Sequence, residues 1–271
     1  MKIQVNKILI SVLIITGFSL LSCDDILGPI DTNPSKTDRL YKDRNFAEGL
    51  FLRGYTGWLN NYLLEEVATD DAVNNVRGNS YQRMATGEWS ALYNTLSAWN
   101  SSYQVLYYLN YFLSISDDIL YAWDDRQSPA ELRASYYKQK FIGETKLLRA
   151  WHNFELLKKH GGIASDNTPL GFVIMREVPD RSNYNIPRNT YNECVQFILE
   201  DIQEGLSKLP MFYADRPGDV AYNTVYGNLD GKNEGRVNGK FAKALKSRVL
   251  LHAASMPFYN VPGKWDSAAV A

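Results

Sequence analysis

The segment from Asp70 to Asn94 carries side chains that could bind a polyhydroxylated molecule such as a sugar. Flat aromatic rings can cover the apolar C–H faces of a sugar ring, and planar amide, guanidinium or carboxylate groups can pair with two neighbouring hydroxyls. The candidate ligand contacts are Asp71, Asn74, Asn75, Arg77, Tyr81, Arg83, Trp89 and Asn94. A solvated loop with Trp89 packed beneath it is the alternative interpretation, because no motif fixes individual positions.

The three histidines offer a second candidate chemistry, zinc binding. His152 and His160 lie two turns apart on one expected helix, and His252 lies on another. No H-E-x-x-H motif or nearby carboxylate ligand accompanies them, so hydrogen-bonded or surface histidines are favoured and no metal is expected. The Asn- and Asp-containing stretch 228–233 does not have the spacing of an EF-hand loop and is interpreted as an exposed turn.

Catalytic chemistry is not indicated by the other motifs. Cys194 lies in the first turn of an expected helix, where a thiolate is stabilised, but no histidine is placed by sequence to activate it. The sequence contains no nucleophile elbow, P-loop or dinucleotide-binding motif. The carboxylates Glu65, Glu66, Asp70 and Asp71 are too close in sequence to face each other across a glycosidase cleft on their own. We therefore expect an inert Cys194, no cofactor and no enzyme activity.

These candidate residues need a scaffold, and the stretch from Ser128 to Gly162 predicts its central helix. Ser128 and Glu131 form a capping box, with Pro129 at a position where its missing N–H costs little. At helical spacing the apolar and small residues form two stripes, which indicates two packing neighbours. One stripe carries Tyr136, Gly143, Leu147, Ala150, Phe154 and Leu157, and the other carries Phe141, Leu148 and Trp151.

Small residues and the C-terminal end of this helix carry further predictions. Gly143 and Ala150 lie two turns apart on one stripe, and we expect them to let another backbone approach closely. Ordinary small residues on an exposed face are the alternative. The basic residues 158–160 complement the negative end of the helix, and Gly161 is expected to end it in a left-handed conformation.

Two helices are expected before the central one. The first runs from Phe46 to Leu64, where apolar residues keep helical spacing. The second covers residues 97–118, and the residues expected on its core-facing side are Trp99, Tyr103, Leu106, Tyr107, Asn110 and Leu113. The polar segment 65–97 between them is predicted as a long loop with one turn of helix. Loops of this length in a compact domain are usually functional or disordered.

Two more helices are expected after Phe172–Met175, a short apolar run predicted as one strand or an extended crossing. A capping box of Thr190 and Glu193 starts the first of them. Its inward residues are expected to be Val195, Ile198, Leu199, Ile202 and Leu206, and its outward residues Glu200, Asp201 and Glu204. Asn238 caps the second helix, and the residues from 211 to 236 before it are predicted as loop.

Capped helical pairs with small residues at their crossings predict a mostly α-helical fold, an α-solenoid with long loops and little β structure. Ala150-x-x-x-Phe154 fits the A-x₃-F part of the tetratricopeptide pattern. A last helix begins at Trp265 and is too short to nucleate alone before Ala271. We therefore expect the chain to be the N-terminal part of a longer protein.

The first residues have the layout of a bacterial secretion signal. Lys2 and Lys7 form a basic region, and the apolar run from Ile8 to Leu21 is short for a membrane span. The sequence Leu20-Leu21-Ser22-Cys23 resembles the bacterial lipobox, so residues 1–22 are predicted as a signal peptide and Cys23 as a lipid-attachment site. A buried cysteine behind an uncleaved signal anchor is the alternative.

The remaining N-terminal features concern how the chain meets a membrane. Residues 23–38 are rich in Pro, Asn, Asp, Ser and Thr and are predicted as a spacer, followed by one helical domain over 39–271. Acyl chains would attach the mature protein to a membrane without crossing it. The formal net charge of −1 among 271 residues, with no basic stripe, argues against a nucleic-acid partner. Cys194 is the only other cysteine, so no internal disulfide is expected once Cys23 is lipidated.

Taken in order, these features resemble the SusD/RagB family of outer-membrane nutrient-binding lipoproteins. The resemblance rests on Ser22-Cys23-Asp24-Asp25, ATDDA at 68–72, Trp99-x-x-x-Tyr103 leading to Asn110, GETKLLRAWHNFELLKKHGGI, RNTYNECVQFILEDIQEGLSKLP, and FAKALKSRVLLHAASMPFYN followed by Lys264-Trp265. It covers essentially the whole chain, and the central helix is its most specific part. Family members are typically much longer, which implies that a C-terminal part with much of the ligand-binding face is absent.

The resemblance implies a lipid-anchored, non-catalytic protein on the outer surface of the outer membrane. Its tetratricopeptide-like helical pairs would face a SusC-like TonB-dependent transporter, and its other face would capture oligosaccharides, or less often peptides, for delivery. In the family, a loop in the region of residues 70–94 contributes to the glycan platform. The alternative is a structural helical-repeat lipoprotein that docks a partner protein and binds no small ligand.

Overall fold

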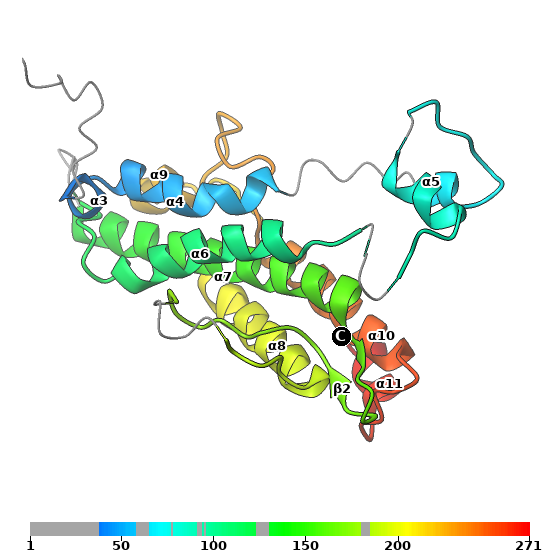
Figure 1. The fold of residues 1–271 in the computed structure, drawn as a ribbon. Coiled ribbons are helices and arrows are strands. Elements are labelled where there is room, and N and C mark those ends of the chain that lie inside the picture. Colours follow the sequence, from blue (N-terminus) through cyan, green and yellow to red (C-terminus); the bar gives the residue numbers. More distant parts are fainter. Residues whose placement is uncertain are drawn as a thin grey trace, which may run out of the picture. The chain divides into compact units, whose positions relative to one another are not determined.

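The computed structural model describes residues 38–57, 65–76, 78–90, 94, 96–122, 130–179 and 185–271. Its helices are α3 (Asp38–Lys42), α4 (Arg44–Thr56), the 3₁₀ helix η1 (Glu65–Ala68), α5 (Ser80–Ala85), α6 (Trp99–Ile115), α7 (Ala130–His160), α8 (Tyr191–Lys208), α9 (Val220–Tyr226), α10 (Gly239–Ser255) and α11 (Lys264–Ala269) (Figure 1). Two short strands, β1 (Gly162–Ile163) and β2 (Pro169–Leu170), form an antiparallel pair. The predicted mostly α-helical fold with little β structure is confirmed, and its helical pairs are compatible with a tetratricopeptide-like scaffold.

The N-terminal predictions fall outside the described residues. The predicted signal peptide at 1–22, the lipid-attachment site Cys23 and the spacer up to residue 37 therefore stay predictions, as does the domain boundary at residue 39. Among the helices that the structure describes, none combines the length and the apolar character needed to span a bilayer.

Helix α7 is the central element, because it contacts α4, α6, α8, α9 and α10. Figure 1 shows it running alongside α6 and crossing α8. Both stripes predicted for it face neighbours, since every predicted residue is buried except Tyr136, which is half-buried. The helix begins at Ala130, and the predicted capping residue Ser128 lies outside the described residues.

The crossing of α7 and α8 is close because both helices carry a glycine there. A Cβ on Gly143 would lie 2.8 Å from the side chain of Leu209. A Cβ on Gly205 would lie 2.6 Å from the side chain of Leu147 and 3.0 Å from the carbonyl oxygen of Gly143. The prediction that Gly143 lets another backbone approach is therefore confirmed.

Gly161, after the end of α7, serves a different purpose from the one predicted. Its backbone does not adopt the left-handed conformation. A Cβ at this position would lie 2.5 Å from the carbonyl oxygen of Leu157 and 3.0 Å from the ring of Tyr191. The left-handed cap is thus a wrong prediction, and glycine is needed because neighbouring atoms leave no room for a side chain.

A buried ion pair joins α7 to α8 at a carboxylate predicted to face outward. Asp201 is only 2% exposed and accepts two hydrogen bonds from Arg149, each 2.7 Å long. A third nitrogen of Arg149 donates to the side chain of Asn110 on α6 at 2.9 Å. The outward assignment of Asp201 is wrong, because a bidentate arginine partner makes burial of this charge tolerable.

The segment Phe172–Met175 is an extended crossing and not a strand. The Tyr103 hydroxyl accepts from the Val173 N–H at 2.9 Å and donates to the Val173 carbonyl at 2.8 Å. The Asn110 side chain donates to the carbonyl of Met175 at 2.9 Å. Side chains of α6 therefore satisfy backbone groups that a neighbouring strand would bond in a sheet.

One residue on the predicted core face of α6 points elsewhere. Leu106 and Asn110 are buried, and Trp99, Tyr103 and Leu113 are half-buried, as expected of that face. Tyr107 is 44% exposed, so its core assignment is wrong. The buried stripe of α6 is completed by other residues at helical spacing, namely Val105, Leu109, Phe112 and Ile115.

The predicted loop from 211 to 236 contains a helix, α9. Asp219 caps it by accepting from the N–H of Tyr222 at 2.9 Å. At seven residues, α9 is too short to show a helical apolar period in the sequence. The following turn at 228–233 is only partly exposed, because Asn233 is buried and its side chain bonds to Lys140 and to two backbone carbonyls.

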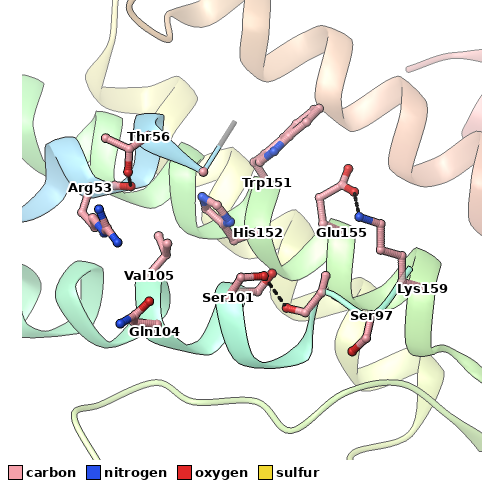
Figure 2. A pocket seen from close by; sticks show the side chains of 13 residues that line it. Arg53, Thr56, Ser97, Ser101, Gln104, Val105, Trp151, His152, Glu155 and Lys159 are labelled. Carbon is pink, nitrogen blue, oxygen red and sulfur yellow. Dashed lines mark hydrogen bonds and ion pairs between the residues drawn. The ribbon is translucent and has the colours of Figure 1, made fainter. Parts of the chain in front are cut away.

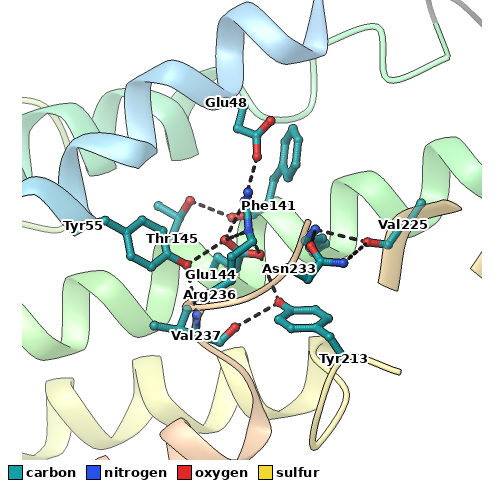
Figure 3. A network of polar contacts seen from close by, with 11 residues as sticks. Glu48, Tyr55, Phe141, Glu144, Thr145, Tyr213, Val225, Asn233, Arg236 and Val237 are labelled. Carbon is teal, nitrogen blue, oxygen red and sulfur yellow. Dashed lines mark hydrogen bonds and ion pairs between the residues drawn. The ribbon is translucent and has the colours of Figure 1, made fainter. Parts of the chain in front are cut away.

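The buried carboxylate of Glu144 on α7 is the centre of a polar network, which Figure 3 shows. Glu144 accepts hydrogen bonds from Tyr55 at 2.8 Å, from Tyr213 at 3.0 Å and from Arg236 at 2.8 Å. Arg236 also pairs with Glu48 of α4 at 2.7 Å. Burial opposes the Arg236 charge, but the charge and hydrogen bonds of Glu144 raise the pKa of Arg236 above its ordinary value. Burial raises the pKa of Tyr213, so this hydroxyl stays protonated and can donate.

The glycines predict opposite effects of the same substitution at two sites. Gly205→Ala should lower the free energy of unfolding by about 1–3 kcal/mol, because the new methyl group would clash at the α7–α8 crossing. Gly49→Ala should raise it by about 0.5–1 kcal/mol, because Gly49 lies inside α4 and a Cβ there would meet no atom within 4 Å. Urea unfolding of both variants measures the difference, and equal effects would contradict the close crossing.

The Glu144 network predicts a large loss of stability from a small chemical change. Glu144→Gln should lower the free energy of unfolding by about 2–3 kcal/mol, because the amide removes the charge that faces half-buried Arg236 and leaves one acceptor oxygen for three buried or half-buried donor side chains. Glu200→Gln is the matched control, since it breaks an exposed pair with Arg176 and should cost less than about 1 kcal/mol. Thermal unfolding compares the two variants, and a similar small loss in both would show that the network is not important for stability.

Candidate functional site

The predicted ligand residues from 71 to 75 lie on an exposed stretch after η1. Asp71 is exposed, and its carboxylate accepts from the hydroxyl of Thr69 at 3.3 Å. Asn74 is half-buried, and its side-chain oxygen accepts from the N–H of Val76 at 2.7 Å, which makes a local turn. Asn75 is exposed. The carboxylate and amide groups of this stretch are thus presented at the surface.

The predicted residues around α5 form a second part of the segment. Arg83 pairs with Glu88 at 3.7 Å, and a Cβ on Gly78 would lie 3.4 Å from the Arg83 guanidinium. Tyr81 is half-buried in the first turn of α5. Trp89 is 45% exposed, so it is not packed beneath the loop, which was the alternative interpretation.

One predicted residue, Asn94, is placed differently from these. Asn94 is bound to the scaffold, because its side chain donates to the carbonyl of Lys159 at 3.1 Å and accepts from the N–H of Leu96 at 2.9 Å. Its amide therefore ties the end of the segment to the end of α7. Arg77 lies outside the described residues.

A cavity of about 430 Å³ lies where the long connection between α4 and α6 leaves the helices and returns to them. Its walls come from the C-terminal end of α4, the N-terminal half of α6 and the last turns of α7 (Figure 2). The lining residues are Arg53, Thr56, Gly57, Ser97, Ala98, Ser101, Ser102, Gln104, Val105, Trp151, His152, Glu155 and Lys159. We call it the α4–α6–α7 cavity. It lies at the base of the segment that holds the predicted ligand residues.

This cavity was not predicted from the sequence. Its polar residues come from α4, from α6 and the residues just before it, and from α7, and no motif of the sequence links those on α7 to Arg53 or Gln104. Arg53 and Gln104 show no signal in the sequence beyond their positions on the outer faces of expected helices. Only the packing of α4 and α6 against α7 brings them together.

The three histidines are engaged in structural contacts, as predicted. The ring of His152 is buried and lies 2.9 Å from the carbonyl oxygen of Gly54, so this nitrogen carries the proton and donates. His160 accepts from the N–H of Ala98 at 3.2 Å, and His252 lies 3.1 Å from the hydroxyl of Tyr191. In the part of the chain that the structure describes, no three His, Cys, Asp or Glu residues are grouped to hold a metal ion.

Cys194 has the surroundings of an inert thiol. It is fully buried, and its sulfur lies within hydrogen-bonding distance of both the N–H and the carbonyl of Phe172. Burial raises the pKa of the thiol to about 12, so the nucleophilic thiolate is not populated at neutral pH. The helix N-terminus does not overcome this desolvation.

Comparison with known proteins assigns the chain to a protein family. A family model described as "Starch-binding associating with outer membrane" matches residues 52–224, which is more than half of the chain. The chain belongs to the SusD-like family. The matched span of this SusD-like protein includes the predicted ligand segment, the α4–α6–α7 cavity and all of α7. No protein with a curated description matches it.

Solved SusD-like structures share the fold of this SusD-like chain at low identity. A SusD-like protein from Bacteroides fragilis is 22% identical with a TM-score of 0.52, and the match covers 82% of this chain and 37% of that one. A laminarin-binding SusD-like protein is 18% identical with a TM-score of 0.58, covering 85% and 42%. A SusD homologue from Bacteroides thetaiotaomicron is 16% identical with a TM-score of 0.58, covering 89% and 42%. The chain therefore spans about two fifths of the length of these relatives.

The histidines predict how stability changes with pH. Burial is the main cause that lowers the pKa of His152, His160 and His252 below the ordinary value of about 6.5. The unfolded chain therefore binds more protons than the folded chain below that pH, so stability should be constant near neutral pH and fall as the pH decreases from 6.5 to 5.5. Urea unfolding at several pH values measures this slope.

His152→Gln keeps a donor for the Gly54 carbonyl and removes one titrating group, so its stability should fall less steeply in the same pH range. A variant slope equal to that of the parent protein would show that His152 is not held neutral by the fold.

Proposed function

We propose that this SusD-like protein is a lipid-anchored surface protein that binds oligosaccharides, or peptides, and delivers them to a SusC-like TonB-dependent transporter. The observation that carries the proposal is the family match over residues 52–224, which spans the exposed segment of aromatic and polar side chains. The family description names starch binding and association with the outer membrane.

The chemistry of the segment supports a sugar ligand. Trp89 is 45% exposed and can cover an apolar sugar face, while Asp71, Asn75 and Arg83 offer planar groups that can pair with hydroxyls. Asn74, Arg77 and Tyr81 belong to the same proposed surface. A relative with the same fold is named as laminarin-binding, which supports a carbohydrate as the first ligand class to test.

The proposed location rests on the N-terminal sequence. Cys23 in Leu20-Leu21-Ser22-Cys23 would carry the lipid, residues 23–38 would form the spacer, and the helical domain over 39–271 would stand at the outer membrane. In this arrangement the helical scaffold faces the transporter and the loop segment faces the nutrients. A non-catalytic role is supported by the inert surroundings of Cys194 and by the binding description of the family.

The rival function is a structural lipoprotein that docks another protein through its helical pairs and binds no small ligand. The exposed Tyr107 and Tyr108 of α6 favour this candidate, because aromatic side chains are enriched at protein interfaces. The two functions differ in whether an isolated protein retains a carbohydrate.

Glycan retention by the complete protein, including any residues that follow Ala271, tests the proposal. Trp89→Ala should weaken binding of a retained oligosaccharide roughly tenfold, which corresponds to about 1.4 kcal/mol of lost ring contact. Trp265→Ala is the matched control, because Trp265 is also exposed but lies on α11, and it should bind as the parent protein does. Isothermal titration calorimetry after a glycan-array screen provides the measurement.

Retention of no oligosaccharide or peptide by the complete protein would contradict the proposal. If the same preparation copurified with a TonB-dependent transporter, that result would support the structural alternative. Equal losses in Trp89→Ala and Trp265→Ala would leave glycan binding in place but remove Trp89 from the site.

A further inference from the structure

The α4–α6–α7 cavity has two polar ends and a less polar centre. Figure 2 shows Arg53 and Gln104 at one end and Ser97, Glu155 and Lys159 at the other. Between these ends lie the uncharged side chains of Trp151 and Ser101 and the ring of His152, which is buried and has a lowered pKa. At about 430 Å³ the cavity falls within the range of roughly 300–1,000 Å³ that small-molecule sites occupy.

The carboxylate in the cavity is already neutralised by its neighbours. Glu155 is nearly buried, and its two oxygens lie 2.6 Å from the ammonium of Lys158 and 3.6 Å from that of Lys159. Two cations therefore compensate one anion at this end. A cationic ligand would have to compete with both lysines for Glu155.

The guanidinium at the opposite end has no such compensation. In the described part of the chain, Arg53 makes no ion pair, and its guanidinium donates no hydrogen bond. The side-chain amide of Gln104 is likewise without a hydrogen-bond partner among the described residues. Together they offer a fixed positive charge with several N–H donors, and next to it an amide that can both donate and accept.

Hydroxyl groups of the walls can complete a polar site. Thr56 donates to the carbonyl of Arg53 at 2.9 Å, and Ser101 donates to that of Ala98 at 3.2 Å. Because each hydroxyl proton is directed to the backbone, the oxygens remain able to accept hydrogen bonds from a ligand. The cavity thus offers acceptors for hydroxyl groups and, for an anionic group, a guanidinium that no carboxylate of the described residues pairs with.

We propose that the α4–α6–α7 cavity binds an acidic sugar unit, a pyranose ring that carries a carboxylate, at the base of the glycan-binding segment. The carboxylate pairs with the guanidinium of Arg53, and ring hydroxyls bond to Gln104 and to the wall oxygens. This assignment rests on the proposed function and deepens it, because it names the sugar class that the scaffold itself selects. An arginine–carboxylate pair can be bidentate, which makes it stronger and more specific than a neutral hydrogen bond.

Binding of matched acidic and neutral oligosaccharides to the complete protein tests this assignment. The probes are tri-galacturonate, tri-glucuronate and tri-mannuronate, each compared with its methyl ester, which keeps the sugar skeleton and removes the charge. We expect at least one acid to bind about tenfold more tightly than its ester. This preference should shrink when the salt concentration increases from 50 to 500 mM, because Arg53 is exposed to solvent.

Three variants locate the site. Arg53→Gln should lower affinity for the preferred acid about tenfold and leave its ester unchanged. Lys243→Gln is the matched control, because it removes the same charge from an exposed position of α10 outside the cavity, and it should bind as the parent protein does. Ser101→Trp fills the cavity from an exposed position and should lower affinity for the acid without removing a charge. Circular dichroism confirms that each variant is folded.

The outcomes separate the inference from the function it rests on. If glycans bind but every acid and ester bind equally, or if Arg53→Gln keeps the acid preference, the acidic-sugar assignment is overturned while carbohydrate binding stands. If Lys243→Gln loses as much as Arg53→Gln, the preference is a general charge effect and the cavity assignment is also overturned. If the complete protein retains peptides but no carbohydrate of any kind, the acidic-sugar assignment is overturned while the proposed function stands. If it retains neither, both fail.

Discussion

The position of α4 on the scaffold depends on one buried carboxylate. Glu144 is removed from water, which is tolerable because three side chains donate to it, one of them the charged guanidinium of Arg236. Tyr55 brings the last turn of α4 to this point, and Tyr213 and Arg236 bring the chain before α10 to the same point. Arg53 and Thr56, two residues of the cavity wall, belong to the same turns of α4 as Tyr55. The geometry of the candidate site therefore follows from how this carboxylate is satisfied.

A second buried charge, Arg149, sets how three other segments meet. Its guanidinium bonds to Asp201 on α8 and to Asn110 on α6, and Asn110 in turn holds the extended crossing through Met175. Such polar contacts are directional, so they favour one register of the helices over others of similar apolar packing. Glu144 and Arg149 both lie on α7, so this one helix carries the two buried polar contacts that hold α4, α6 and α8.

Local rules predicted the helices well because they depend on neighbouring residues. The capping box of Thr190 and Glu193 is present as expected, and Asn238 caps α10 by accepting from the N–H of Phe241. The same rules misplaced Asp201, because a charge on a helix face is assigned to solvent unless its partner is known. That partner, Arg149, is 52 residues away in the chain and becomes visible only in the folded structure.

The candidate site was predicted only in part, for a related reason. Composition pointed to the segment 70–94, and the structure exposes Trp89 and Asp71 there but uses Asn94 to tie the segment to α7. In a sequence, an asparagine that contacts a ligand cannot be distinguished from one whose side chain bonds to the backbone of its own scaffold. The cavity residues gave no pattern, because Arg53 and Gln104 become neighbours only when α4 and α6 pack together.

The C-terminal end of α7 binds the last residues of the long connection between α4 and α6. The ring of His160 accepts a hydrogen bond from the N–H of Ala98, and its centroid lies 5.3 Å from the ring centroid of Trp99. The backbone carbonyl of Lys159 accepts a hydrogen bond from the side-chain amide of Asn94. A connection between fixed helices can change length at little entropic cost, since closure depends only weakly on the number of residues. The residues of the connection can therefore change in number and in type while the helical framework beneath them keeps its shape.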